Sequence, residues 1–160
     1  MSANPNWPRW MFASVADHFK QAADAGGLPL LIEGIEDRTS EKIRKIDHAE
    51  LRINGPILNE VSKGYFKIRL DVNILIQSMM TEQNAYKLMQ NCGVMLAACD
   101  VIGIFRVGIG PDDDQEQIGC FFLRKELAQP VSVIHFGQLA PDVRIRSAIV
   151  SAQFETYLSY

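Results

Sequence analysis

Residues 66–77 alternate between apolar and polar side chains almost without a break, and this stretch constrains the fold more than any other. Successive side chains of a β-strand point to opposite faces of the sheet, so the alternation predicts a strand with one buried and one solvent-facing side. Its length of about 12 residues is twice the usual one. Such long strands in a small chain are typical of proteins that present a surface to other chains. The apolar positions are Phe66, Ile68, Leu70, Val72, Ile74 and Ile76, with Leu75 the one exception in the other phase.

A second alternating segment, residues 49–54, precedes the long strand. Gly55-Pro56 interrupts it, and we expect residues 57–61 to continue it after a β-bulge. Ser62-Lys63-Gly64 has the composition of a turn, so the long strand should run back antiparallel to its predecessor. The two strands are predicted to form a hairpin of unusual length.

Two segments, 8–24 and 85–99, repeat apolar residues every three or four positions, which predicts two amphipathic helices. Gly93 lies in the second helix, and its missing side chain would let that helix lie close to the sheet. Pro29 places the short apolar run 28–35 at the start of a strand or on a sheet edge. The remaining predicted elements are a second hairpin over 102–123, strands over 131–136 and 145–158, and a charge-rich loop over 36–47.

Strand hairpins joined by two amphipathic helices predict an α+β fold, in which the helices pack on one face of a mainly antiparallel sheet with long hairpins. We expect a single domain over residues 1–160, because this length is typical of one domain. Residues 1–8 are polar and contain two prolines, and they are predicted to form an N-terminal arm.

The composition argues against several classes of function. The chain is 48% hydrophobic and 22% charged, with a formal charge of −3, which is ordinary for a soluble globular protein. Non-specific nucleic-acid binding needs a basic surface, and none is indicated. No apolar run of about 18 residues exists, so no membrane span is expected, and the N-terminus lacks the pattern of a secretory signal. The three cysteines, interpreted as reduced thiols rather than zinc ligands, are Cys92, Cys99 and Cys120.

The sequence predicts no catalytic site, no cofactor and no metal. Gly108-Ile109-Gly110 begins like a phosphate-binding loop, but Asp113 occupies the third glycine position and no helix follows. The aspartates at 112–114 are interpreted as a hairpin tip that is solvated, contacts a basic patch on a neighbouring subunit, or binds calcium, although the EF-hand spacing is absent. The three histidines have no positioned partner for acid–base catalysis: His18, His48 and His135.

Aromatic residues and arginines supply the candidate contact sites. Trp7 and Trp10 either anchor the first helix in the core or dock on another protein. Arg144 and Arg146 alternate at the start of the final strand, where they lie on a wet sheet face, line a channel or pair with carboxylates. The residues predicted to contact a subunit or partner are Trp7, Trp10, Asp112, Asp113, Asp114, Arg144 and Arg146.

The order of these segments resembles that of bacteriophage tail-terminator and neck proteins at the head–tail junction. Those proteins have an N-terminal helix, a long antiparallel hairpin, a helix laid across the sheet and closing strands. The matching segments here are residues 12–23, 51–77, 85–99 and 145–158. Short stretches are also similar to virion proteins of tailed phages: Trp7-Pro8-Arg9-Trp10, residues 50–56, and Phe136-Gly137-Gln138 followed by Pro141-Asp142-Val143-Arg144.

The resemblance implies a non-enzymatic virion protein that is made in the host cytoplasm and forms a ring, commonly a hexamer. Its partners would be copies of itself and other tail and connector proteins, with DNA only as passing cargo and no membrane. An acidic chain suits such a pore, because a basic lumen would hold phosphates. The alternatives are another tail-completion or head–tail adaptor protein, a host binding module and a small-molecule enzyme. The 36–47 loop and the Asp112–Asp114 tip take no role from the resemblance.

Overall fold

The computed structural model describes residues 6–34, 47–78, 82–106, 115–125, 129–140 and 143–159. The described helices and strands confirm the α+β class. In chain order they are α1 (Trp7–Ala25), β1 (Leu30–Ile32), β2 (His48–Ser62), β3 (Tyr65–Ser78), α3 (Glu82–Ala97), β4 (Val101–Arg106), β5 (Glu116–Leu123), β6 (Val131–Ala140) and β7 (Val143–Ser159).

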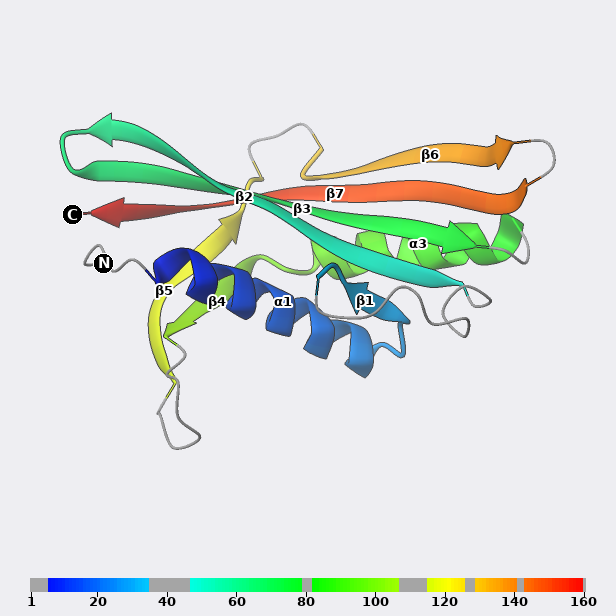
Figure 1. Ribbon diagram of the computed structural model, residues 1–160, viewed down its shortest axis with the longest axis horizontal. Coiled ribbons are helices and arrows are strands. Elements are labelled where there is room, and N and C mark those ends of the chain that lie inside the picture. Colours follow the sequence, from blue (N-terminus) through cyan, green and yellow to red (C-terminus); the bar gives the residue numbers. More distant parts are fainter. Residues whose placement is uncertain are drawn as a thin grey trace.

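All of these strands belong to one sheet with the order β1-β2-β3-β7-β5-β4, and β6 also pairs with β7. One edge of β7 therefore has two neighbours, β6 up to Ala152 and β5 at Phe154 and Glu155. The sheet is mixed rather than purely antiparallel, because β1 enters the edge beside β2 in the same direction. Figure 1 shows β5 and β4 turning away from the long strands towards α1, so the sheet curls as a half-barrel.

The long hairpin is confirmed. β3 pairs with β7 without interruption from Tyr65 opposite Ser159 to Ser78 opposite Arg146. The pairing of β2 with β3 shifts register between Asn54 and Ile57, which is the expected bulge. Gly55 has a φ of 116° at this position, and a Cβ there would lie 3.1 Å from the carbonyl oxygen of Arg69. Glycine is therefore required where the strand bends.

Both helices pack on the same face of the sheet, as predicted. The apolar phase of β3 faces them, and Ile68, Val72 and Ile74 are fully buried. Phe19 of α1 meets Phe154 of β7 at a ring-centroid distance of 6.0 Å. This face forms one hydrophobic core cluster with both helices.

The boundaries differ from the prediction in a few places. α1 begins at Trp7, so Trp7 and Pro8 belong to the helix rather than to the arm; proline fits the first turn because its missing N–H needs no partner there. α3 ends at Ala97, two residues before the predicted end at Cys99. Of the predicted arm, loop and hairpin tip, residues 1–5, 35–46 and 107–114 lie outside the described residues.

Candidate functional site

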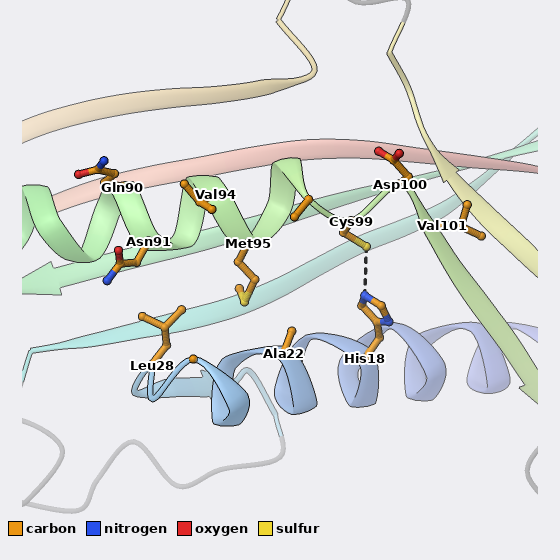
Figure 2. Close-up of a pocket in the computed structure, with 12 residues that line it drawn as sticks. His18, Ala22, Leu28, Gln90, Asn91, Val94, Met95, Cys99, Asp100 and Val101 are labelled. Carbon is orange, nitrogen blue, oxygen red and sulfur yellow. Dashed lines mark hydrogen bonds between the residues drawn. The ribbon is translucent and has the colours of Figure 1, made fainter.

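A groove of about 700 Å³ lies between α1 and α3. Figure 2 shows His18 and Ala22 of α1 on one side and α3 on the other, with the Cys99 thiol reaching towards His18. Much of its wall is apolar. The lining side chains include Ala22, Leu28, Val94, Met95 and Val101, with the polar residues His18, Gln90, Asn91 and Asp100 at its margins.

Cys99 Sγ lies 3.1 Å from His18 Nε2 in this groove, a pairing of residue types that some enzymes use for nucleophilic catalysis. Burial lowers the pKa of His18. Burial, together with the charge of Asp100, raises the pKa of the Cys99 thiol to about 11. Both groups are therefore neutral at pH 7, whereas a nucleophilic cysteine acts as a thiolate. The pair joins α1 to the end of α3 and lacks the charge state of a nucleophile.

A charged cluster lies on the face of the sheet opposite the helices. Glu155 of β7 is 2.8 Å from Lys67 Nζ and 3.1 Å from Arg124 Nε. The hydrogen bond between Lys67 and Glu155 raises the pKa of Lys67. Arg124 also donates to Gln153 Oε1 at 2.9 Å, and Lys67 lies 5.6 Å from the ring centroid of Tyr157. The cluster ties β3, β7 and the segment after β5 together.

Next to this cluster the same face carries a polar hollow of about 440 Å³. Ser151 donates to Asn73 Oδ1 at 2.6 Å across the two central strands. Asp71 Oδ1 and Arg69 Nε are buried without a hydrogen-bond partner. Hydroxyl, amide and carboxylate groups can hold a polar group here, but none of the residues is a nucleophile beside a base. The polar lining residues are Asp71, Asn73, Gln129, Ser132, Ser151 and Gln153.

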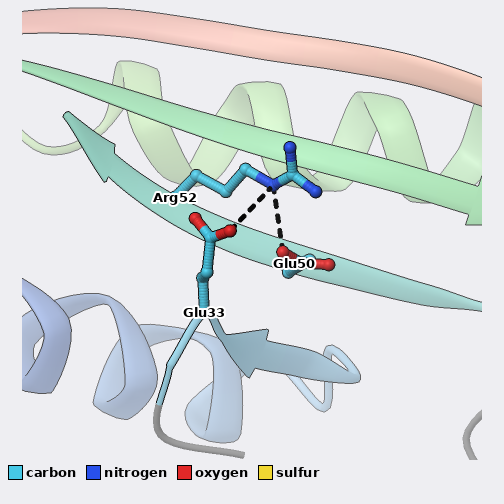
Figure 3. A network of polar contacts seen from close by, with 3 residues as sticks. All are labelled: Glu33, Glu50 and Arg52. Carbon is cyan, nitrogen blue, oxygen red and sulfur yellow. Dashed lines mark hydrogen bonds and ion pairs between the residues drawn. The ribbon is translucent and has the colours of Figure 1, made fainter. Parts of the chain in front are cut away.

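A third cluster of polar side chains links β2 to the end of β1 at the edge of the sheet. Arg52 Nε lies 3.0 Å from Glu50 Oε1 and 3.9 Å from Glu33 Oε1, as Figure 3 shows. Glu50 is buried although it points away from the helices. The guanidinium compensates the burial of this carboxylate and holds the end of β1 against β2, which is a structural role.

Of the predicted contact residues, the structure describes Trp7, Trp10 and Arg146 with their side chains. Trp7 and Trp10 are 8% and 7% exposed and belong to the core, which leaves little of either ring for a partner. The guanidinium of Arg106 lies 5.8 Å from the ring centroid of Trp10. Arg146 is half-buried opposite Ser78. Outside the described residues and side chains lie Asp112, Asp113, Asp114 and the side chain of Arg144.

The sequence analysis missed the exposed apolar positions. On β2, Ile57, Leu58 and Val61 are 42%, 38% and 60% exposed, and on β6 Val133 and Ile134 are 47% and 53% exposed. The sequence predicted residues 57–61 as a strand continued after a bulge and residues 131–136 as a strand, but neither prediction reveals which strand edge lacks a neighbour. For β6 the available signal was an apolar run without lysine or proline at residues 131–136, whereas residues 54–62 of β2 contain Pro56 and Glu60.

Among the described residues, no group of three or more histidine, cysteine, aspartate or glutamate side chains is placed to hold a metal ion. None of the described helices combines the length and the hydropathy that crossing a bilayer would require.

No protein-family model and no curated protein matches this chain. A solved structure whose name states no function superposes with a TM-score of 0.50 at 9% sequence identity. The superposition covers 96% of this chain and 96% of the other. At this identity the likeness concerns the fold alone, and it extends over nearly the whole of both chains.

Proposed function

We propose that this protein is a structural virion protein of a tailed bacteriophage, a tail-terminator or neck subunit that forms a ring between the tail and the head connector. The observation that carries the proposal is the distal half of β2, residues 54–62. It is exposed on both faces although Ile57, Leu58 and Val61 are apolar. Figure 1 shows the tip of the β2–β3 hairpin extending past the start of α1.

An extended arm of this kind supports assembly better than it supports catalysis. Monomeric proteins rarely gather apolar side chains on an exposed surface, because such side chains gain free energy when another chain covers them. The groove between α1 and α3 offers a neutral thiol and a neutral imidazole, as its geometry and burial indicate. The element order also resembles that of ring-forming tail proteins. Another tail-completion or head–tail adaptor protein would use the same surfaces.

The ring is tested by native mass spectrometry and negative-stain electron microscopy of the purified protein, and by its presence in purified particles. We expect a closed oligomer, with six copies as the first expectation, and bands at the head–tail junction in particles labelled with an antibody. A protein that stays monomeric at every concentration and is absent from particles would refute the proposal. A small-molecule enzyme, in contrast, would bind a ligand in a concave pocket and would be absent from particles.

A further inference from the structure

β6 is an edge strand of the sheet formed by the described residues. It pairs with β7 on one side, and no described strand pairs with its other side. Residues 131–136 read Val-Ser-Val-Ile-His-Phe and include neither lysine nor proline. Val133, Ile134 and Phe136 are about half exposed. Natural edge strands usually carry charges, prolines or a cover that prevents another strand from pairing. The first half of β6 therefore has the properties of a strand that receives a partner.

The opposite edge of the same sheet is also open. β1 pairs with β2 only from Ala49 to Leu51. Beyond Arg52, no strand in the described part of the chain covers this edge of β2, which continues to Ser62. Ile57 and Val61 are exposed there. Among the described strands, β6 and the distal half of β2 thus offer two different unpaired edges, each with exposed apolar side chains.

The strand directions allow these two edges to meet. β2, β3, β7 and β6 alternate in direction, because each pairing between them is antiparallel. β2 and β6 therefore run in opposite directions. A rotation that preserves strand direction places β6 of one copy beside β2 of the next in an antiparallel pair. The helices of both copies then stay on the same face, so neither copy turns its core face towards solvent.

The positions of the two edges along the strand direction also fit a closed ring. Val133 is level with Val150 of β7 and, through it, with Ile74 of β3. Ile57 is level with Arg69, which lies nearer the hairpin turn. Pairing the two segments therefore displaces each copy along the strands. Closed sheets require such a stagger, because their strands tilt by about 35–45° to the axis.

From these observations we infer that neighbouring subunits join by pairing β6 of one copy with the distal half of β2 of the next. This inference rests on the proposed ring function and specifies its interface. The contact is head-to-tail, since the two edges differ, and such contacts form rings when the rotation closes. At each edge, the partner strand belongs to a second copy of this chain. Main-chain hydrogen bonds supply the pairing, and Val133, Ile134 and Ile57 supply the apolar contact.

The inference is tested with two variants that each block one edge. Ile134→Lys places a charge on β6, and Ile57→Asp places one on β2; both side chains are exposed, so each chain should keep its fold, as circular dichroism can verify. We expect each variant alone to sediment as a monomer. Phe122→Lys is the matched control, because Phe122 is 52% exposed on β5 and lies on neither edge. It should assemble like the parent.

Mixing the two variants gives the sharper test. The Ile134→Lys chain keeps an intact β2, and the Ile57→Asp chain keeps an intact β6, so one productive interface remains between them. Native mass spectrometry should therefore show a one-to-one dimer that grows no further. If Ile57→Asp alone dimerises through β6, or if both variants still form the parent ring, the inference is wrong.

The failure of this interface is distinguishable from the failure of the proposed function. Rings that persist in both variants contradict the β6–β2 contact and leave the ring function standing. If the parent chain assembles only on tails, the same variants are scored in purified particles, where Phe122→Lys should be present and the two edge variants absent. A parent chain that neither forms rings nor occurs in particles contradicts both proposals.

Discussion

The two halves of β2 belong to one strand and share one partner, yet they differ in burial. Ala49 and Leu51, beside β1, are fully buried. Past the bulge at Gly55, Ile57 and Leu58 are as apolar as Leu51 and are 42% and 38% exposed. Both halves pair with β3. Pairing therefore makes the strand, whereas burial depends on which other elements lie against it.

The two strands of the hairpin also differ in burial at paired positions. Ile68 of β3 lies opposite Leu58 and is fully buried in the hydrophobic core cluster, whereas Leu58 is 38% exposed. The exposed aliphatic side chains Ile57, Leu58 and Val61 thus lie on the outer strand of the hairpin, while Tyr65 of β3, beside the turn, is 40% exposed. We interpret the distal half of β2 as the place where the protein's own packing ends and contact with another chain begins.

The largest expected effect is a difference in stability loss between a buried position of β3 and an exposed position of distal β2. Val72→Asp places a charge on a fully buried position and should lower the free energy of unfolding by about 4 kcal/mol or more, so that little folded protein remains. Ile57→Asp introduces the same side chain at an exposed position and should cost less than about 1 kcal/mol. Urea denaturation of both variants measures the difference. Equal losses would show that the distal half of β2 is part of the folded core.

A second expected effect compares two glutamates. Glu155 is 13% exposed at its side chain and contacts Lys67 and Arg124. Glu155→Gln should lower stability by about 2 kcal/mol, because it leaves Arg124 with a weaker partner in a half-buried site. Glu60→Gln on distal β2 should change stability by less than about 0.5 kcal/mol, since Glu60 is exposed and accepts one hydrogen bond from the Gly64 N–H. Equal effects in chemical denaturation would contradict the comparison.

A third prediction applies one substitution to two glycines. A Cβ at Gly93 would lie 4.0 Å from Val150 Cγ1, an ordinary contact, so Gly93→Ala should stabilise α3 by about 0.5–1 kcal/mol. The close approach of α3 to the sheet therefore does not require glycine. Gly64 has a φ of 75° in the hairpin turn, and Gly64→Ala should destabilise by about 1 kcal/mol. Thermal melts should move in opposite directions; a loss at Gly93 would mean that the helix cannot yield to a methyl group.

The smallest expected effect is a pH dependence in the buried part of the molecule. Burial lowers the pKa of His18 below its usual 6.5. The unfolded chain therefore binds a proton more readily than the folded one, and stability falls as the pH decreases from 6.5 towards the folded pKa. His18→Gln should show a shallower fall between pH 7.5 and pH 5.5 in denaturation experiments. An identical slope in parent and variant would mean that His18 titrates normally in the folded protein.

Local patterns were sufficient to predict most of the secondary structure. The alternation in residues 66–77 predicted β3, and the three- and four-residue spacing predicted α1 and α3, because each pattern reflects which side of one element is buried. The bulge at Gly55-Pro56 and the turn after Ser62 were predicted from residues with special backbone preferences.

Contacts between distant residues were not predictable in this way. Cys99 and His18 are 81 positions apart, and their contact follows from how α1 and α3 share the sheet. The pairing of Lys67 with Glu155 follows from the register of β3 with β7. The parallel entry of β1 and the sharing of one β7 edge by β5 and β6 depend on chain direction, which periodicity does not contain.

By itself, the sequence determined which residues form helices and strands and which side of each is apolar, because those properties depend on neighbours in the chain. Only the tertiary structure decided that distal β2 and β6 are open edges of the described sheet. An edge is open when no other strand occupies the space beside it, and that depends on the placement of every strand at once.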